Sequence, residues 1–463
     1  MFVTIDDVRK AVLSGTSVLD IAHYYLKNIN TNKHLNAFVE VFEDEVLEEA
    51  KRIDKKIQEG TAKSLAGVVI GIKDNICLKT HKVSASSKIL ENFTSLYTAT
   101  ALQRLMDEDA IVIGRLNCDE FAMGGSNETS YFGPVQNNYK ENYVPGGSSG
   151  GSAVAVSANL CTISLGSDTG GSIRQPASWT NTFGMKPTYG RISRYGLIAY
   201  ASSFDQIGCF SNDLPGCELI TKVMSGKDPA DSTSSSNTWE DGVSKGLQKI
   251  AVFKEHYTNE YIDSEVRDRF MEKLENLKSK GIEIQEYDFP YLDVLVPCYY
   301  ILTTAEASSN LSRFDGVHYG YRSASAKGLE ETFKLSRSEG FGSEVKRRIM
   351  AGTFVLSHGY YDAYYSKAQK VRRLIKDYTE NILQENDLIM LPSTLGTAFE
   401  IGKITDPIAM YMQDIFTVHA NLTGNPAISI PFAMHSNGLP YGLQFIGKEF
   451  EEQNLFQQVS QIA

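Results

Sequence analysis

The sequence predicts an α/β protein built on one large mixed, twisted sheet that helices cover on both faces. Three observations lead to this fold class: short apolar runs typical of buried strands, stretches with helical spacing between them, and the same alternation resuming after a polar loop at residues 231–237. Strands that alternate with helices in this way usually form a parallel or mixed sheet between two helical layers.

In the first half of the chain, helical patterns come before the strands. The first sixty residues have helical character, and residues 44–58 carry Val46, Ala50 and Ile53 at the spacing of one helix face. Residues 65–72 (LAGVVIGI) are an apolar run that ends in Lys-Asp-Asn, as expected of a buried strand that opens into a loop. A helical stretch and two strand-like runs follow at residues 98–109, 110–114 and 161–166.

The second half repeats the order strand, helix, strand. Residues 263–280 carry an apolar stripe and stop before Gly281, which indicates an amphipathic helix. Strand-like runs flank this helix at residues 249–253 and 282–289. A Tyr-rich helical region follows at residues 290–380, and late strands are expected at residues 387–391, 427–431 and 442–446. We expect the late strands to return to the same sheet as the early ones.

The predicted organisation is a single unit over residues 1–463. It has an N-terminal helical segment at 1–60, a core at 61–215, and a remainder at 216–463 that completes the sheet. Two separate domains are the alternative, because the chain is long enough for them.

Composition and charge exclude several functional classes. The 463 residues include 45 Lys and Arg against 56 Asp and Glu, a net charge of −11, which argues against a chain that grips nucleic acid unaided. No apolar run approaches the roughly 18 residues of a membrane helix, and the start shows no secretory signal. We therefore expect no membrane partner and a cytoplasmic protein, with an organelle matrix as the alternative. The six cysteines and eight histidines are dispersed, which predicts no disulfide framework and no metal.

Two Gly- and Ser-rich segments are the most unusual feature of the sequence. Residues 145–152 are PGGSSGGS, and residues 164–176 are SLGSDTGGSIRQP. A flexible linker would not enclose the apolar, Ala- and Val-rich stretch that lies between them. The phosphate-binding motifs GxxxxGK[ST] and GxGxxG are absent from both segments, and no histidine lies nearby to serve a GxSxG nucleophile elbow.

Glycines beside serines suit a serine nucleophile, because they let backbone N–H groups approach a developing oxyanion. Four consecutive donors are available, the N–H groups of Thr169, Gly170, Gly171 and Ser172. A serine also needs a base, and no histidine lies nearby, so a lysine kept neutral by burial is the candidate. Lys73, at the end of the apolar run, is suitably placed, with a solvated loop lysine as the plain alternative.

The sequence resembles the amidase signature family in its three hallmark segments. These are residues 71–75 (GIKDN), 145–153 (PGGSSGGSA) and 166–176 (GSDTGGSIRQP), and residues 185–190 (MKPTYG) extend the match. The resemblance implies a single large amidase-signature fold and a triad of a lysine, a serine held by a cis peptide bond and a second serine. Carried over to this sequence, Lys73 would be the base, Ser148 the relay and Ser172 the nucleophile, with residues 169–172 as the oxyanion hole.

Further segments resemble one branch of that family, the A subunits of glutamyl-tRNA(Gln)/aspartyl-tRNA(Asn) amidotransferases. The likeness extends from about residue 35 to the C-terminus and includes residues 116–125, 195–208, 306–316, 336–342, 352–373 and 442–447. It implies a glutaminase within a ligase of protein biosynthesis, which supplies ammonia to convert Glu-tRNA(Gln), or Asp-tRNA(Asn), to the amidated form. The rivals are a stand-alone amidase that acts on another small amide and a scaffold subunit without catalysis.

The same likeness implies how glutamine is held and which partners are required. Arg348 would bind the α-carboxylate and Asp414 the α-ammonium group, with Tyr299 nearby and Arg347 as the alternate to Arg348. No cofactor is expected in this chain. A B subunit would bind the misacylated tRNA and use ATP and Mg²⁺, and a small C subunit would complete a heterotrimer.

Overall fold

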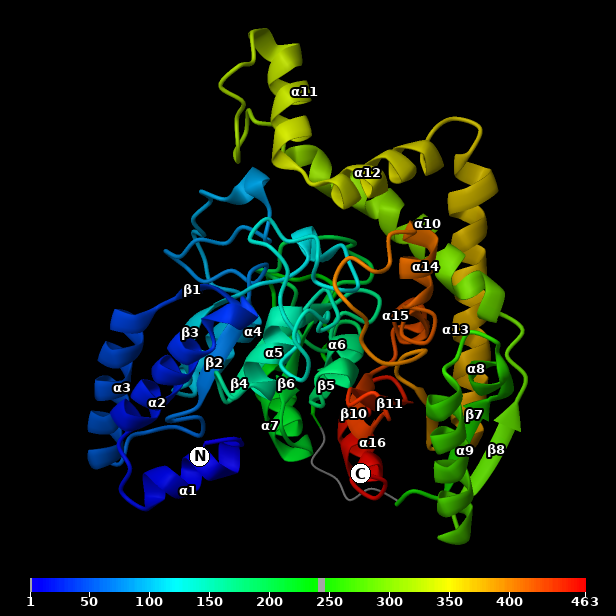
Figure 1. The fold of residues 1–463 in the computed structure, drawn as a ribbon, viewed down its shortest axis with the longest axis horizontal. Helices are drawn as coiled ribbons and strands as arrows, with labels where there is room; N and C mark the ends of the chain where they lie inside the picture. The colour runs from blue at the N-terminus through cyan, green and yellow to red at the C-terminus, as the bar shows by residue number, and fades with distance from the viewer. Residues whose placement is uncertain (1, 240–245) are drawn as a thin grey trace.

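One 11-stranded sheet forms the centre of the molecule, in the order β1-β3-β2-β4-β6-β5-β10-β11-β9-β7-β8. The structure is a computed structural model that describes residues 2–239 and 246–463. The strands are β1 (Phe38–Val41), β2 (Val69–Lys73), β3 (Ile111–Leu116), β4 (Ile163–Asp168), β5 (Phe183–Lys186), β6 (Gln206–Ser211), β7 (Lys249–Phe253), β8 (Glu283–Tyr287), β9 (Leu388–Pro392), β10 (Ala427–Met434) and β11 (Pro440–Ile446). The sheet runs across Figure 1 from the N-terminal strands at the left to β7 and β8 at the right.

The sheet is mixed, as predicted. Strand β2 runs parallel to both β3 and β4, and β7 runs parallel to both β8 and β9, whereas the remaining neighbours are antiparallel. The late strands β9, β10 and β11 therefore join the sheet of the early ones. Strands β2, β4, β6, β9 and β11 are buried at every position. A strand buried on both sides has both faces covered, so the α/β/α expectation is confirmed.

Helices flank the sheet along its whole length (Figure 1). They are α1 (Ile5–Leu13), α2 (Val18–Thr31), α3 (Glu43–Gln58), α4 (Thr100–Asp107), α5 (Gly150–Ser157), α6 (Arg174–Trp179), α7 (Leu214–Met224), α8 (Lys254–Thr258), α9 (Ser264–Ser279), α10 (Leu292–Asn310), α11 (Gly328–Gly340), α12 (Ser343–Val355), α13 (Lys367–Glu385), α14 (Pro407–Met412), α15 (Val418–Thr423) and α16 (Glu452–Val459). Short turns of helix add η1 (Lys33–Leu35), η2 (Lys88–Leu90), η3 (Glu120–Ala122), η4 (Leu311–Arg313) and η5 (Tyr361–Ser366). Among the described residues, no helix has the length and apolar character needed to cross a bilayer.

Three strands were not predicted from the sequence. Strand β1 lies within the first sixty residues, which were expected to be helical, and it pairs with β3 in antiparallel orientation. Strands β5 (FGMK) and β6 (QIGCFS) are short and contain glycine, so they lack the apolar run that marks the other strands. Their pairing with each other and with β4 and β10 makes them strands, and such context often outweighs local propensity. The single-unit organisation with bounds at 60 and 215 stays a prediction.

The topology brings the ends of two parallel strands to one edge of the sheet. Lys73 is the last residue of β2, and Asp168 is the last residue of β4. Because β2 and β4 are parallel neighbours, the loops that follow them open on the same side. The hallmark segments at 71–75 and 166–176 therefore meet in space.

Candidate active site

Lys73 ends inside the protein, surrounded by serine hydroxyls. Its side chain is fully buried, and Nζ lies 2.7 Å from Ser148 Oγ, 2.9 Å from Ser149 Oγ and 2.9 Å from Ser167 Oγ. Burial lowers the pKa of Lys73 to about 8. Hydroxyl groups can donate to a neutral amine or accept from an ammonium group, so this setting makes the neutral lysine accessible near physiological pH.

The serine-rich loop brings Ser148 against Lys73 and lies beside the segment of Ser172. The peptide bond between Gly147 and Ser148 is cis. The next residue, Ser149, donates its backbone N–H to the carbonyl oxygen of Ser172 at 3.2 Å, so the two Gly- and Ser-rich segments lie directly against each other. Ser172 is 7% exposed, whereas Ser148 is fully buried. The structure thus brings Lys73 and Ser148 into contact and holds the Ser172 segment beside them.

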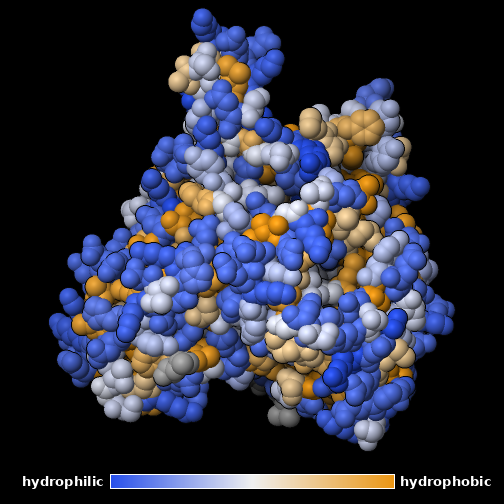
Figure 2. Space-filling view, viewed as in Figure 1, coloured by the Kyte–Doolittle hydropathy of each residue, from blue (hydrophilic) through white to orange (hydrophobic). Residues whose placement is uncertain are grey.

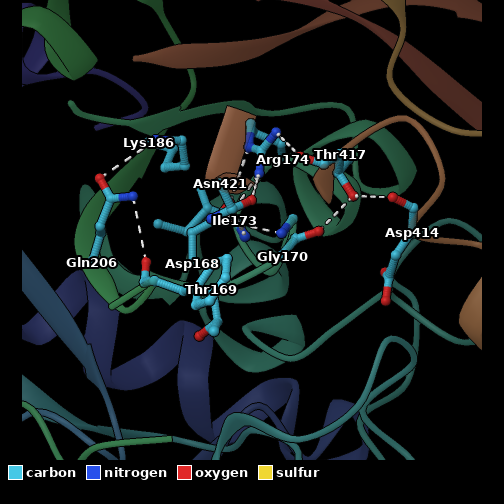
Figure 3. A network of polar contacts seen from close by, with 12 residues as sticks. Asp168, Thr169, Gly170, Ile173, Arg174, Lys186, Gln206, Asp414, Thr417 and Asn421 are labelled. Atoms are coloured by element: carbon cyan, nitrogen blue, oxygen red, sulfur yellow. Dashed lines mark hydrogen bonds and ion pairs between the residues drawn. The ribbon is translucent and has the colours of Figure 1, made fainter. Parts of the chain in front are cut away.

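A buried ion pair supports the loop that carries Ser172 (Figure 3). Asp168 accepts from the Arg174 guanidinium at 3.0 and 3.1 Å and from the backbone N–H groups of Gly171 and Ile173 at 2.8 and 3.1 Å. Asp168 and Arg174 are both fully buried. Burial alone would raise the pKa of Asp168, but the Arg174 guanidinium outweighs burial and holds that pKa at about 2. The charged carboxylate therefore fixes the course of residues 168–174.

In this structure one of the four predicted oxyanion donors already has a partner. The N–H of Gly171 is engaged by Asp168, because the loop wraps around that carboxylate. The N–H groups of Thr169, Gly170 and Ser172 remain as candidates. The Thr169 side chain donates to buried Asp205 at 2.7 Å, and burial raises the pKa of Asp205 to about 7.

The loop fits closely against the segment that follows α14. Thr417 Oγ1 donates to the carbonyl oxygen of Gly170 at 2.7 Å, and the Thr417 carbonyl accepts from Arg174 at 2.7 Å. Gly171 has φ +131°, and a Cβ at this position would overlap the Thr417 side chain. The glycine is therefore required both by its backbone conformation and by this packing.

We predict that Gly171→Ala lowers kcat for the amide hydrolysis expected from the sequence by about 100-fold, since a shift of the loop by about an ångström misplaces the reacting groups. The assay is release of ammonia from an amide substrate, with glutamine as the expected one. Gly438→Ala is the matched control: its φ is +84°, but a Cβ there meets nothing within 4 Å. Equal activity of the two variants would contradict the role assigned to this packing.

Arg348 points inward from α12 and is 4% exposed. Its Nε donates to Glu344 at 2.8 Å, and its Nη1 donates to the Tyr200 hydroxyl at 2.9 Å. The rings of Tyr200, Tyr300 and Tyr411 have centroids 5.1 to 5.6 Å from the guanidinium carbon. Arg348 is therefore a held, inward-facing cation, whereas its neighbour Arg347 is about half exposed.

Asp414 lies on the other side of Tyr300. The Tyr300 hydroxyl donates to Asp414 Oδ2 at 2.8 Å, and the Tyr300 ring stacks on Tyr411 at 4.0 Å between centroids. Withdrawal of its carboxyl group from water raises the pKa of Asp414 to about 7. A cation bound beside it would favour the charged carboxylate, which suits a site for an ammonium group.

Tyr299 joins the two halves of the site. It is buried in α10, and its ring lies so close to Gly170 that a Cβ on that glycine would overlap the ring. Of the predicted residues, Tyr299 thus packs on the loop of residues 169–172 directly, and Thr417 joins Asp414 to that loop. Arg348 is connected to Asp414 through Tyr300.

The structure adds residues that were not singled out from the sequence. Ser149 and Ser167 complete the hydroxyl cage of Lys73, although both lie within the quoted Gly- and Ser-rich segments. Tyr200, Tyr300 and Glu344 hold Arg348 and Asp414. Tyr200 lies in the segment 195–208 noted above and Tyr300 in the Tyr-rich region, whereas no sequence signal pointed to Glu344. Within residues 2–239 and 246–463 no group of three His, Cys, Asp or Glu side chains could hold a metal ion, and the six cysteines are free thiols.

Comparison with known proteins gives matches over nearly the whole chain. A relative from Chlorobium phaeobacteroides (strain BS1), named as the A subunit of glutamyl-tRNA(Gln) amidotransferase, is 48% identical and covers 98% of this chain and 97% of its own. The crystal structure of a protein of the same name from Thermotoga maritima superposes with a TM-score of 0.79 at 38% identity, over 98% of this chain and 92% of that one. A bacterial aryl acylamidase of the amidase signature family shares the fold, with a TM-score of 0.85 at 20% identity over 100% and 96% of the two chains.

The family model described as Amidase matches residues 20–456. That range contains the lysine, the two serine-rich segments and the groups around Arg348 and Asp414. The chain therefore belongs to the amidase family.

Proposed function

We propose that this chain is the glutamine-hydrolysing A subunit of a tRNA-dependent amidotransferase. The observation that carries the proposal is the contact between buried Lys73 Nζ and Ser148 Oγ, at 2.7 Å, beside the loop of Ser172. It supplies a base without histidine, next to a serine with backbone donors around it. The names of the most similar relatives support the amidotransferase over other amidases.

In the proposed reaction, neutral Lys73 takes a proton from Ser148 while Ser148 takes one from Ser172. The Ser172 Oγ then bonds to the side-chain amide carbon of glutamine. The negative charge that develops on the amide oxygen is stabilised by the N–H groups of Thr169, Gly170 and Ser172. The proton held by Lys73 returns through Ser148 to the amide nitrogen, which leaves as ammonia.

The γ-glutamyl ester on Ser172 is then hydrolysed. Water attacks the ester carbon and gives up a proton toward Lys73, and the same N–H groups stabilise the second oxyanion. Glutamate leaves, and the hydroxyl of Ser172 is restored. Arg348 and Asp414 would hold the α-carboxylate and the α-ammonium group of the substrate in both steps.

The ammonia has a use only if a partner consumes it. We propose that a B subunit binds the misacylated tRNA, activates its acyl group with ATP and Mg²⁺, and receives the ammonia, while a C subunit completes the complex. The net charge of −11 agrees with a tRNA held mainly by that partner. We place this complex in the cytoplasm, with an organelle matrix as the alternative.

Exposed apolar side chains agree with a chain that works in a complex. Met350, Phe354 and Leu356 near the end of α12 are 65, 48 and 37% exposed. Figure 2 shows a largely hydrophilic face with apolar residues gathered at the upper right, where α12 ends. Apolar groups of this kind commonly mark protein–protein contacts.

The amino-acid pocket separates this proposal from a stand-alone amidase, because a neutral amide needs neither Arg348 nor Asp414. We expect Arg348→Ala to raise the KM for glutamine about 30-fold or more, since a buried charged contact is lost. Steady-state glutaminase assays of the co-purified complex measure it.

Arg347→Ala is the matched control, because Arg347 is the adjacent residue and also pairs with Glu344 but is about half exposed. It should leave the KM close to that of the unmodified protein. An unchanged KM in Arg348→Ala, or an equal effect of both variants, would show that the glutamine pocket has been assigned to the wrong residues.

A further inference from the structure

The side chain of Gln175 is held at one end only. Gln175 lies in α6 and is fully buried. Its Oε1 accepts the backbone N–H of Gly147, the residue before Ser148, at 2.9 Å. A backbone N–H can only donate, so the oxygen of the amide must face Gly147 and the nitrogen must face the opposite way.

The nitrogen at the other end has nothing to donate to. Nε2 of Gln175 is buried and has no hydrogen-bond partner among the described residues. Buried polar groups in folded proteins are nearly always paired, so an orphaned donor beside an active site calls for an acceptor that the protein itself does not supply.

The orphaned donor and the predicted ammonium anchor border the same space. An ideal Cβ on Gly125 would lie 3.5 Å from Gln175 Nε2 and 3.7 Å from Asp414 Oδ1, and no other described residue beyond Gly125 and its two chain neighbours has a heavy atom within 4 Å of that point. Gln175 Nε2 and Asp414 Oδ1 therefore both lie next to Gly125, on the side where it has no side chain. A ligand that lies beside Gly125 would meet a donor from Gln175 and an acceptor from Asp414.

The neighbouring cation, Arg348, has part of its donor set already committed. Its Nε donates to Glu344 and one N–H of its Nη1 donates to Tyr200, which leaves three of its five N–H groups. A carboxylate has two oxygens and about four acceptor sites, so it can accept from Arg348 and from a further donor as well.

We propose that Gln175 is a specificity-determining substrate residue, whose Nε2–H donates to the α-carboxylate of glutamine while Asp414 accepts from the α-ammonium group. The α-carboxylate and the α-ammonium group of glutamine are bonded to the same carbon atom, which agrees with Gln175 Nε2 and Asp414 Oδ1 lying beside the same residue, Gly125. The inference rests on the proposed function, because it requires an α-amino acid as the substrate.

The test compares glutamine with 4-aminobutanamide, which has the same amide and ammonium groups but no α-carboxylate. The co-purified complex is assayed for the KM of glutamine and for the inhibition constant of 4-aminobutanamide.

Gln175→Glu keeps an acceptor for the Gly147 N–H and removes the donor, and Gln175→Met removes the donor without adding charge. Both should raise the KM for glutamine about 10-fold or more, the loss expected for a hydrogen bond to a charged group. In Gln175→Met, the inhibition constant of 4-aminobutanamide should stay within about 3-fold of its value in the unmodified complex, because that ligand has no α-carboxylate to accept this hydrogen bond.

Two results would overturn the inference. In the first, both ligands weaken equally, which means that Gln175 acts only through Gly147 and the serine loop. In the second, neither ligand changes. Failure of the proposed function is separate and visible earlier, because the unmodified complex would then not hydrolyse glutamine at all.

Discussion

Replacing Lys73 with methionine lowers kcat/KM for glutamine by about 1,000-fold or more, which is the size of decrease expected when a catalytic triad loses its base. The reason is that Ser172 then has no path for its proton. Amidation of the misacylated tRNA with glutamine should fail in the variant complex, while added ammonium chloride should restore it, since ammonia bypasses the damaged step.

The pH dependence gives a second readout of the same base. Because burial lowers the pKa of Lys73 to about 8, the neutral fraction of this amine grows as the pH rises from 7 to 9. Accordingly, kcat/KM should increase through about pH 8 and then level off.

The matched control is Lys186→Met. Lys186 is also fully buried with its pKa lowered by burial, to about 7, but its Nζ donates to the Pro187 carbonyl and not to serines. Lys186→Met should keep most of the activity, and comparable losses in the two variants would contradict a specific role for Lys73.

Removing the carboxylate of Asp168 has the largest expected effect on stability. Asp168→Ala leaves the buried Arg174 guanidinium without its counter-charge, which costs about 3–5 kcal/mol. It also frees the N–H groups of Gly171 and Ile173, which Asp168 now holds. Chemical denaturation of the purified protein measures the free energy of unfolding, and glutaminase activity should fall together with it.

The pH dependence of this stability has a defined sign. The pKa of Asp168 is about 2 in the folded protein, below its ordinary value of 3.8. The stabilisation is therefore complete above about pH 4 and is lost as the pH falls toward 2. Asp6→Ala is the control, because Asp6 pairs with Lys10 on the exposed side of α1. Surface pairs contribute little, so an Asp168→Ala protein no less stable than Asp6→Ala would refute the structural role of the buried pair.

The sequence was most informative where chemistry depends on residue type and order. Lys73 at the end of an apolar run was recognisable as a candidate base, and serines among glycines were recognisable as candidate nucleophiles. The family resemblance then assigned Ser148 as the relay. Partners made by tertiary packing were not visible. Ser167 reaches Lys73 because β4 lies parallel to β2, and Tyr300 links Arg348 to Asp414 because α10 packs against α12.

For the fold as well, features set by local sequence were predicted and features set by tertiary packing were not. Apolar or amphipathic stretches such as β7, β9 and α9 were found with bounds close to those observed. The strands β1, β5 and β6 were missed, since β1 lies in a region with helical patterning and β5 and β6 contain glycine and lack a continuous apolar run. All three are strands because of their neighbours. The Gly171 N–H, predicted as an oxyanion donor, donates to Asp168 in the structure, a contact that depends on the path of the loop and is not visible in the motif.

The central claim is that a lysine at position 73 activates a serine at position 172, and the ester that this serine forms can be observed. The complex should be treated with a glutamine analogue that acylates the nucleophile but is released slowly, digested, and analysed by mass spectrometry. We expect the added mass on Ser172 in the unmodified protein and none in Lys73→Met. Label on any other residue, or full labelling of Ser172 without Lys73, would contradict the account.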